Sequence, residues 1–516
     1  MLVNQKNRKL VLNLRDPTRI LNTLPTARTL KYKGETLTVV PHRSMEVRVL
    51  KNMGFSPPSP VDYYYDWPIK QGWSPLAHQK VTTKFLVENP FSYCLNDMGT
   101  MKTLSALWAY DYLRAEGAVR KMLVVSPLST IERAWADEIF FNLPHLRFAV
   151  LHGSKQRRLD LLSTDVDVYI INHDGVKVIL NALVSKLDID VVLIDELAQA
   201  ARNARTERWR AYKSLTNKRK VIWGMTGTPT PNEPTDAWAQ CRLITPTTVP
   251  PYAATFKRMV MYQASQFRWS PKDNAMQTVY DAMQPAIRYK RDDCIDLPPV
   301  TYETRHAAMT KEQTAMFKEM TAELRIQLRG KEITAVNEAV KTMKLVQVAC
   351  GAVYGADGDS IVTPPKHRLI ALKEVIDEAA SKVIVFVPFR KSLDIVNDLL
   401  SKEYTTGLIH GGVGKADRDR VFSGFQSGKD PQIIVAQPAA MSHGLTLTSA
   451  SVIVWFAPIA SAETYEQANA RITRPGQKLN QFIIHLEGTY LERAMYARLK
   501  RKTTMQGVLL DMFRND

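Results

Sequence analysis

The chain has 516 residues, of which 45% are hydrophobic, so it can form about two to four packed domains. Its 69 lysines and arginines outnumber its 51 aspartates and glutamates, giving a net charge of +18. A charge of this size favours a polyanionic partner, with nucleic acid as the first candidate. The alternative is a basic surface with no dedicated ligand.

The cysteines and the apolar segments exclude several other classes of protein. Cys94, Cys241, Cys294 and Cys350 show no paired spacing, which argues against a zinc ribbon or a disulfide framework and for a reducing compartment. The longest apolar stretch, residues 450–462, is too short to span a bilayer. The first residues lack the apolar core of a secretion signal. We therefore expect a cytoplasmic protein with no membrane contact.

Residues 1–66 are predicted to form a small α+β domain. Lys9–Leu14 is typical of a strand, and Pro17–Leu24 is typical of a helix preceded by Asp16. Two further strands flank Gly34-Glu35 as a hairpin, and Ser44–Met53 is predicted to be a second helix. Basic residues outnumber acidic ones in this segment, either as a solvated face or as a face for a phosphate backbone. We favour the second interpretation and assign this domain to the DNA substrate.

From Trp73 onward, strands alternate with helices, the pattern of parallel sheets covered on both faces. We predict a first α/β domain over residues 67–250, a mostly helical connection over 251–298, and a second α/β domain over 299–516. The strands expected in the first domain are Met122–Ser126, Phe148–His152, Val168–Asn172, Val191–Ile194 and Lys220–Met225. Those expected in the second are Val383–Val387, Thr406–Ile409, Gln432–Ala436, Ser451–Phe456 and Phe482–Leu486.

The stretch from Phe91 to Thr103 resembles a phosphate-binding loop. A short apolar run is followed by a turn containing Gly99, then by Lys102-Thr103 and a helical pattern. Helix-start amides would hold phosphate oxygens, the lysine would neutralise charge, and the hydroxyl would meet magnesium. Only one of the usual glycines is present, so this stretch alone is equally compatible with an ordinary strand–turn–helix.

A pair of carboxylates, Asp195 and Glu196, follows the apolar run Val191–Ile194. Carboxylates at the end of a strand suit a magnesium–nucleotide site. Asp195 would hold the ion, directly or through water, and Glu196 would orient and deprotonate the attacking water. A surface acidic pair is the alternative, which the apolar strand before it disfavours.

Two further segments carry candidate phosphate chemistry. Thr226-Gly-Thr-Pro229 places hydroxyls in a tight turn, although a plain turn explains it equally well. The segment from Gln467 to Gln477 places Arg471 and Arg474 three residues apart, which predicts one helical face. Arginine suits bidentate contact with a transferring phosphate, so these two are candidate arginine fingers; a solvated basic face is the alternative.

The order of these motifs resembles that of superfamily 2 helicase-like ATPases, and within them the Swi/Snf family of double-stranded DNA translocases. The resemblance covers residues 73–500, and its most specific part is Gln467–Gln477. It implies two tandem RecA-like domains that bind ATP and Mg2+ between them, with duplex or branched DNA as partner. By this resemblance the catalytic residues are Lys102, Asp195, Glu196, Arg471 and Arg474, and the metal ligands are Thr103 and Asp195. The nucleotide-binding residues it implies are Gln79, Asp97, Met98, Gly99, Thr100, Met101, Lys102, Thr103 and Gly444.

Two positions depart from the family pattern. Met101 stands where the family usually has glycine before the lysine, and its side chain would crowd the β-phosphate. Ala198 stands where the family's acidic box usually ends in histidine, and it cannot make a polar link to the Thr226–Pro229 turn. These departures bear on the rate of hydrolysis.

A second resemblance concerns the N-terminal domain. Ile20–Pro25, Val39–Pro41 and Val49–Phe55 are similar to the HARP module of annealing helicases, which helps a translocase to rewind branched DNA. The compact chain suits a bacterial or phage enzyme, which we expect to be a monomer.

We therefore predict an ATP-dependent DNA translocase that remodels or rewinds forks. One alternative is a strand-separating helicase on DNA or RNA. The other is a nucleotide-gated nucleic-acid clamp with little hydrolysis, for which Met101 and Ala198 are the support.

Overall fold

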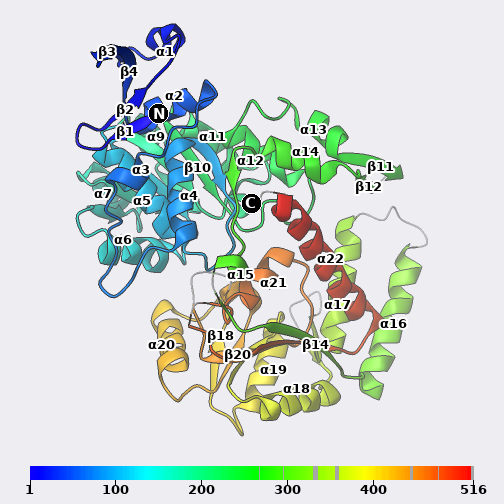
Figure 1. Ribbon diagram of the computed structural model, residues 1–516. Coiled ribbons are helices and arrows are strands. Elements are labelled where there is room, and N and C mark those ends of the chain that lie inside the picture. The colour runs from blue at the N-terminus through cyan, green and yellow to red at the C-terminus, as the bar shows by residue number, and fades with distance from the viewer. Residues whose placement is uncertain are drawn as a thin grey trace. The chain divides into compact units, whose positions relative to one another are not determined.

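The computed structural model describes residues 1–265, 268–294, 296–328, 335–354, 360–441, 446–474 and 476–512 (Figure 1). The chain forms two compact units. The first comprises Met1–Cys294 with Val508–Asp516, and the second comprises Ile295–Gly507. Within the described ranges, no helix is long and apolar enough to cross a membrane.

The first unit begins with a four-stranded antiparallel sheet and two helices. The strands lie in the order β1-β2-β4-β3, and one face of the sheet packs against the helices. The elements are β1 (Leu2–Asn4), β2 (Lys9–Leu12), α1 (Thr18–Thr23), β3 (Arg28–Tyr32), β4 (Glu35–Pro41) and α2 (Ser44–Asn52). The predicted small α+β domain, including the hairpin at Gly34, is confirmed.

This N-terminal domain is bonded to the helices of the parallel-sheet domain that follows it. The backbone N–H of Ser44 donates to Glu116 Oε1 at 2.9 Å, and Lys51 Nζ lies 2.6 Å from Glu88 Oε2. The buried His42 ring contacts the hydroxyl of Tyr64 at 3.0 Å, and burial lowers the pKa of His42. A neutral imidazole is therefore part of this junction.

Seven parallel strands form the sheet of the first unit, in the order β13-β5-β10-β9-β6-β8-β7. Apolar clusters cover both of its faces, as expected for near-continuous apolar strands. The strands are β5 (Phe91–Cys94), β6 (Lys121–Ser126), β7 (Phe148–Val150), β8 (Val168–Asn172), β9 (Ile189–Ile194), β10 (Val221–Met225) and β13 (Ala286–Ile287). The helices are α3 (Val61–Tyr64), α4 (Ala77–Glu88), α5 (Lys102–Ala115), the π-helix η1 (Ile131–Ala136), α6 (Asp137–Asn142), α7 (Lys155–Ser163), α8 (His173–Val178), α9 (Leu180–Ser185), α10 (Leu197–Ala201), α11 (Glu207–Thr216) and α12 (Asp236–Ile244).

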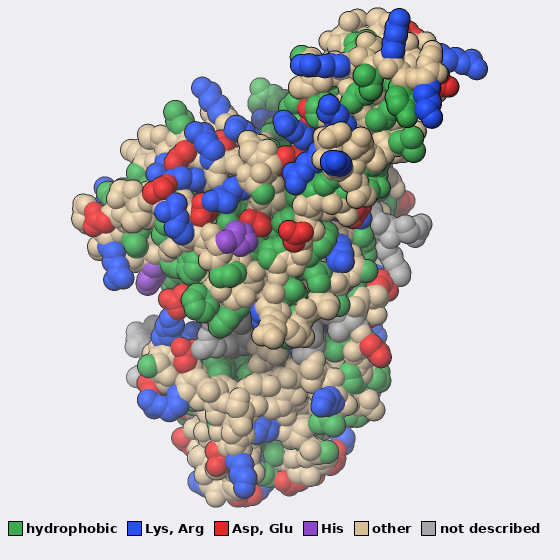
Figure 2. All heavy atoms as spheres, turned by 60° about the vertical axis from the view of Figure 1, so that its left-hand side comes forward, with side chains coloured by type: hydrophobic (Ala, Val, Ile, Leu, Met, Phe, Trp, Pro, Cys, Tyr) green, Lys and Arg blue, Asp and Glu red, His purple; other side chains and the backbone are tan. Residues whose placement is uncertain are grey.

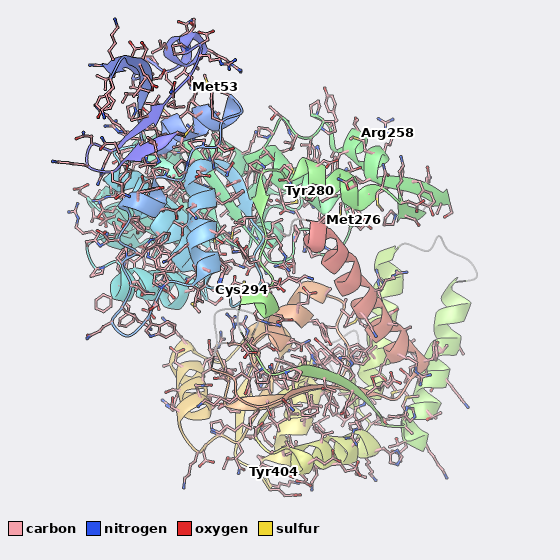
Figure 3. All side chains as sticks on the ribbon, in the orientation of Figure 1. Met53, Arg258, Met276, Tyr280, Cys294 and Tyr404 are labelled. Carbon is pink, nitrogen blue, oxygen red and sulfur yellow. The ribbon has the colours of Figure 1, made fainter. Side chains whose placement is uncertain are left out.

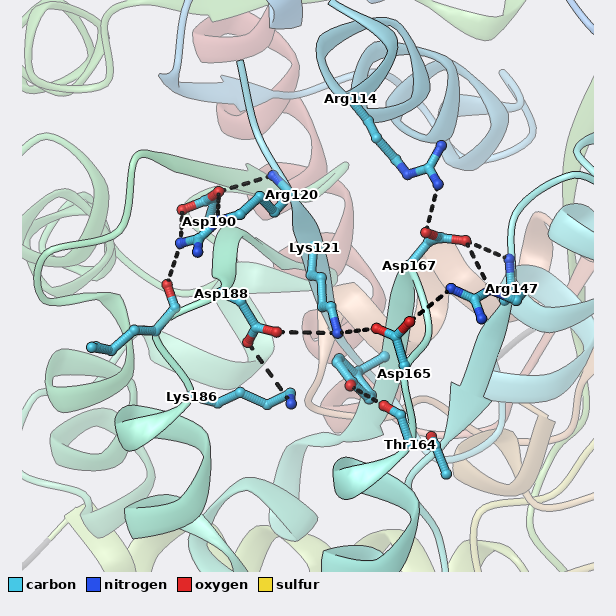
Figure 4. A network of polar contacts seen from close by, with 12 residues as sticks. Arg114, Arg120, Lys121, Arg147, Thr164, Asp165, Asp167, Lys186, Asp188 and Asp190 are labelled. Carbon is cyan, nitrogen blue, oxygen red and sulfur yellow. Dashed lines mark hydrogen bonds and ion pairs between the residues drawn. The ribbon is translucent and has the colours of Figure 1, made fainter. Parts of the chain in front are cut away.

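Ion pairs lie near the amino ends of the central strands of this sheet (Figure 4). Lys121, the first residue of β6, lies 2.8 Å from Asp165 and 3.1 Å from Asp188. Arg120 lies 3.0 Å from Asp190. These carboxylates are paired with cations and have a structural role, unlike the carboxylates at the opposite ends of the strands.

The segment predicted as a mostly helical connection contains both helices and strands. Its helices are α13 (Ala253–Val260), α14 (Ala275–Ala282) and α15 (Arg291–Cys294), the last two marked by the labels Tyr280 and Cys294 in Figure 3. Between α13 and α14 lies an antiparallel hairpin, β11 (Met261–Ser265) and β12 (Arg268–Pro271). The short strand β13 then joins the edge of the first sheet beside β5.

The second unit contains a six-stranded parallel sheet in the order β14-β21-β20-β17-β19-β18. Its strands are β14 (Val300–His306), β17 (Lys382–Phe386), β18 (Thr406–Ile409), β19 (Ile433–Ala436), β20 (Ala450–Trp455) and β21 (Gln481–Glu487), and a small hairpin pairs β15 (Ala352–Tyr354) with β16 (Ser360–Val362). Its helices are α16 (Lys311–Leu328), α17 (Ala335–Ala349), α18 (Lys366–Glu378), α19 (Arg390–Leu400), α20 (Lys415–Ser427), the short η2 (Pro438–Met441), α21 (Ala462–Asn469) and α22 (Tyr490–Met512), whose residues from Val508 onward count with the first unit. A buried pair, Arg368 and Glu492 at 2.7 Å, ties α18 to α22. The predicted class, two tandem parallel-sheet α/β domains after a small α+β domain, is confirmed.

Candidate active site

The strand order of the first sheet brings the predicted site residues of this unit to one edge. Strands β5, β10, β9 and β6 are neighbours in the sheet, in this order. Each of the four is followed by a segment with polar side chains. Parallel strands have their carboxyl ends at the same edge of a sheet, which is where ligands bind in open α/β folds. Four segments therefore lie side by side: the Lys102 loop, the Thr226–Pro229 turn, Asp195-Glu196 and the segment after Ser126.

The loop after β5 ends where α5 begins, at Lys102. The Thr100 hydroxyl donates to the carbonyl of Asp97 at 2.8 Å, and the His78 ring nitrogen Nε2 donates to the carbonyl of Thr100 at 2.9 Å. Burial lowers the pKa of His78, so this contact adds no positive charge. Lys102 Nζ lies 3.3 Å from the carbonyl oxygen of Asn96, so the ammonium group folds back over its own loop.

Met101 has a backbone conformation that explains why the family pattern has glycine at this position. Its φ is +55° and its ψ is +36°, in the left-handed region. A side chain in this region costs about 1–2 kcal/mol, which glycine avoids. The departure noted from the sequence thus coincides with a strained residue immediately before Lys102.

Gln79 is buried and makes two local hydrogen bonds in this structure. Its Oε1 accepts from the backbone N–H of Leu76 at 3.0 Å, at the start of α4. Its Nε2 lies 3.5 Å from the carbonyl oxygen of Met101. The side chain therefore connects the start of α4 to the Lys102 loop, which follows β5.

Residues just beyond β13 also hold the same loop. Arg288, which is 4% exposed, lies 2.7 Å from Asp97 and donates to the carbonyl of Leu95 at 3.1 Å. The backbone N–H of Arg291 donates to the other Asp97 oxygen at 3.0 Å. Asp97 is thus held by main-chain and side-chain donors, which fixes the course of the loop.

Asp195 lies in a buried network built from the segment after β6. The Ser126 hydroxyl donates to Asp195 Oδ2 at 2.8 Å, and the indole N–H of Trp135 donates to the same oxygen at 3.1 Å. The backbone N–H of Glu196 donates to Oδ1 at 3.0 Å. A carboxylate offers about four acceptor positions. The network therefore orients the carboxylate and leaves Oδ1 with spare capacity for a metal ion or its water.

Glu196 is a second non-glycine residue in the left-handed region, with φ at +47°. It caps the start of α10. Strained backbone of this kind costs about 1–3 kcal/mol and clusters at functional sites. Two such residues, Met101 and Glu196, follow strands of the same sheet and flank the same edge.

The Thr226–Pro229 turn lies against the Lys102 loop. A Cβ added to Gly227 would lie 3.7 Å from the carbonyl oxygen of Asn96 and 3.9 Å from the backbone nitrogen of Met98. The Thr228 hydroxyl is buried and has no hydrogen-bond partner among the described residues. The turn therefore presents a spare polar atom beside the loop.

These residues fit a magnesium–nucleotide. The N-terminus of the 14-residue helix α5 favours anions, and Lys102 supplies a cation beside it. Thr103 and Asp195 Oδ1 are oxygen donors of the kind that Mg2+ prefers. Ala198, in contrast, is fully buried in α10 and supplies no polar group.

Arg471 and Arg474 belong to the second unit. The prediction that they share a helical face is wrong, because α21 ends at Asn469 and both arginines lie in the turns that follow. The Arg471 carbonyl accepts from the backbone N–H of Leu447 at 3.0 Å. Gly444 lies outside the described residues.

Comparison with known proteins assigns the chain to a family. Residues 86–351, more than half of the chain, match the SNF2-related domain, and residues 367–476 match the helicase conserved C-terminal domain. The chain belongs to the SNF2-related family. It is therefore a helicase-like ATPase, as the sequence predicted, and the family implies that it uses ATP.

Individual relatives of this SNF2-related chain differ in length. Protein p41 of Acyrthosiphon pisum secondary endosymbiont phage 1 is 24% identical over 85% of this chain and 98% of its own length. The chromatin-remodelling ATPase ISW1 of Saccharomyces cerevisiae is 24% identical over 77% of the chain, which spans 37% of ISW1. Human ZRANB3, named a DNA annealing helicase and endonuclease, is 23% identical over 81% of the chain, which spans 38% of ZRANB3. A Sulfolobus solfataricus SWI2/SNF2 ATPase core in complex with double-stranded DNA is 22% identical, with a TM-score of 0.40 over 86% of this chain and 95% of that core.

Sequence reasoning missed several residues that support the site of this SNF2-related ATPase. These residues act through contacts that join distant parts of the chain: His78, Asn96 (whose Oδ1 accepts from the backbone N–H of Tyr289), Ser126, Trp135 and Arg288. Ser126 is the last residue of β6 and Trp135 lies in η1, and no spacing rule predicts that both side chains donate to Asp195. Arg288 is separated from Asp97 by most of the first unit.

Replacement of Ser126 by alanine is expected to raise the magnesium concentration needed for half-maximal ATP hydrolysis by roughly 10-fold. The change removes one of two donors that orient Asp195 Oδ2, and a hydrogen bond to a charged group contributes about 1.5–3 kcal/mol. Phosphate release measured across a magnesium titration tests this. Ser214→Ala, at an exposed serine of α11, is the matched control. An unchanged magnesium requirement would contradict the role given to the Asp195 network.

Proposed function

We propose that this protein is an ATP-dependent translocase on double-stranded DNA that remodels or rewinds branched DNA. The observation that carries the proposal is the convergence of the Lys102 loop and Asp195-Glu196 at one edge of the first sheet. The net charge of +18 supports a nucleic-acid partner. Relatives named as a chromatin-remodelling ATPase and a DNA annealing helicase support DNA as the substrate.

Each site residue has a role that follows from its chemistry. Lys102 and the amides at the start of α5 would bind the phosphates. By the family resemblance, Gln79 would contact the adenine. Thr103 and Asp195 would hold Mg2+, which supplies charge neutralisation to the phosphates when bound. Glu196 would accept a proton from the attacking water. Arg471 and Arg474 would stabilise charge on the transferring phosphate.

The N-terminal domain is proposed to contact the DNA substrate. Residues 1–54 contain eleven lysines and arginines but only three acidic residues. Cations at this density neutralise backbone phosphates and release counterions. The similarity of this segment to a module of annealing helicases supports a role at branch points.

Phosphate release from ATP, measured with no nucleic acid, single-stranded DNA, duplex DNA, a model fork and RNA, tests the proposal. We expect stimulation by duplex and fork DNA, with the fork the better activator. Stimulation by single strands or RNA alone would instead indicate a strand-separating helicase.

A nucleotide-gated clamp is the second candidate, because Met101 combines a side chain with a left-handed backbone directly before Lys102. Nucleotide-dependent DNA binding without phosphate release under any of these conditions would indicate the clamp. A Met101→Gly variant that gained hydrolysis would show that this residue is the cause.

A further inference from the structure

The sheet of the N-terminal domain has two unlike faces. On one face, Leu10, Leu12 and Val40 are buried against residues of α1 and α2 such as Ile20 and Val47. Side chains alternate between faces along each strand, so the residues between these positions point to the opposite side. We call that opposite side the outer face.

The outer face carries apolar side chains on all four strands. Leu2 pairs with Val11, Val11 with Val39, and Val39 with Arg28, which makes one row across the sheet. On the β3–β4 hairpin, the next pair along is Leu30 with Leu37, and Tyr32 lies opposite Glu35. Of these, Leu2 is 73% exposed, Leu30 53% and Tyr32 57%. None of the six apolar side chains belongs to the core of the domain, and Leu2, Leu30 and Tyr32 remain open to solvent.

Cations flank this apolar face, which also carries the exposed carboxylate of Glu35 opposite Tyr32. Arg28 ends the row described above and is exposed. Lys9 lies on the same face one pair further along β2, opposite Asn4 and Pro41. Lys33 Nζ lies 5.6 Å from the centre of the Tyr32 ring. Figure 2 shows lysine and arginine side chains projecting around the uppermost lobe, which is this domain, with hydrophobic side chains exposed between them.

We propose that the outer face is a binding platform for unpaired nucleotides of DNA. Bases stack on exposed aromatic and aliphatic side chains, and each stacked base contributes about 1–3 kcal/mol. Arg28, Lys9 and Lys33 are placed to contact the phosphates between the bases. A β-sheet that combines an exposed aromatic ring with flanking cations is a common solution to binding single strands.

The chemistry of the face favours unpaired nucleotides over a duplex. In a duplex the base planes are stacked on one another, and only their edges and the phosphates can be reached. The charged phosphates would then lose hydration against Leu2, Leu30 and Tyr32, which costs binding energy. This inference rests on the proposed function in taking the nucleic acid to be DNA. It assigns to the N-terminal domain the binding of the single-stranded part of a branched DNA.

Replacement of Tyr32 by alanine in the full chain tests the platform. We expect the affinity for a labelled oligothymidine of about 12 nucleotides to fall roughly 5- to 100-fold, since one stacking contact is lost. The affinity for a blunt duplex of the same length should change less than about twofold. Fluorescence anisotropy at fixed salt concentration measures both.

Two variants separate stacking from other effects. Tyr32→Phe keeps the ring and is expected to bind single strands like the wild type. Tyr252→Ala removes a tyrosine that is 73% exposed at the start of α13 and should leave binding unchanged. The inference would be overturned if Tyr32→Ala bound the oligothymidine as tightly as wild type, or lost duplex affinity to the same extent.

The proposed function and the platform can fail separately. Duplex-stimulated phosphate release depends on the site in the parallel-sheet domains and should persist in Tyr32→Ala. If wild-type phosphate release shows no response to duplex or fork while Tyr32-dependent binding of single strands remains, the translocase is rejected and the platform stands. The reverse result rejects the platform alone.

Discussion

Lys102→Ala is expected to lower DNA-stimulated phosphate release by at least about 100-fold, which corresponds to roughly 2.7 kcal/mol of lost transition-state stabilisation. The ammonium group lies at the start of α5, 3.3 Å from its own loop at Asn96, where it can neutralise phosphate charge. Alanine keeps the helix but removes this charge. Steady-state phosphate release at saturating duplex DNA measures the effect.

The control for this variant is Lys155→Ala, which removes an exposed lysine at the start of α7 in the same unit. It changes the net charge equally and should leave turnover within about twofold, since isolated exposed charges contribute little. Wild-type turnover in Lys102→Ala would contradict the assignment of the loop after β5 to the phosphates.

Glu196→Gln is expected to abolish turnover while leaving nucleotide affinity nearly intact. The amide has the size of the carboxylate but cannot accept a proton from water, and general base catalysis contributes about 100- to 10,000-fold. The residue follows β9 and has a left-handed backbone beside Asp195, which directs it to the same edge as the Lys102 loop. Single-turnover hydrolysis and the affinity for a fluorescent ATP analogue separate the two effects.

Glu207→Gln, on the exposed start of α11, removes a carboxylate from the same unit and serves as the comparison. We expect it to hydrolyse ATP at the wild-type rate. A Glu196→Gln variant that lost nucleotide affinity in proportion to turnover would indicate a role in binding, and would remove Glu196 from the chemical step.

The structure refines the assignment of Asp97 and Gln79. The sequence places both among the nucleotide-binding residues, but their side chains also hold the loop itself. Asp97 is 2.7 Å from Arg288, and Gln79 caps α4 while lying 3.5 Å from the carbonyl oxygen of Met101. Substitutions at either position are therefore expected to move the loop as well as remove a contact.

Local patterns in the sequence were sufficient to predict the two parallel sheets, the small N-terminal domain and the residues at the ends of β5 and β9. This works because apolar strand runs, a helix that starts at a lysine, and a paired carboxylate are features of a few adjacent residues. The family pattern then placed Lys102, Asp195 and Glu196 in one site, and the strand order β5-β10-β9 brings their strand ends together. A short strand such as β13 has too few residues to show a pattern of its own.

Only the tertiary structure decided which side chains support the site and which face of the four-stranded N-terminal sheet is open. Ser126 and Trp135 meet Asp195 from about 60–70 residues away in the chain, and Arg288 meets Asp97 from still further, because pairing of β9 with β6 and of β13 with β5 brings them there. The row Leu2–Val11–Val39–Arg28 likewise depends on the register of three strand pairs. The period of the hydrophobic pattern alone cannot determine which strands pair, because the pattern of each strand is compatible with several partner strands. Long-range packing selects one of these partners.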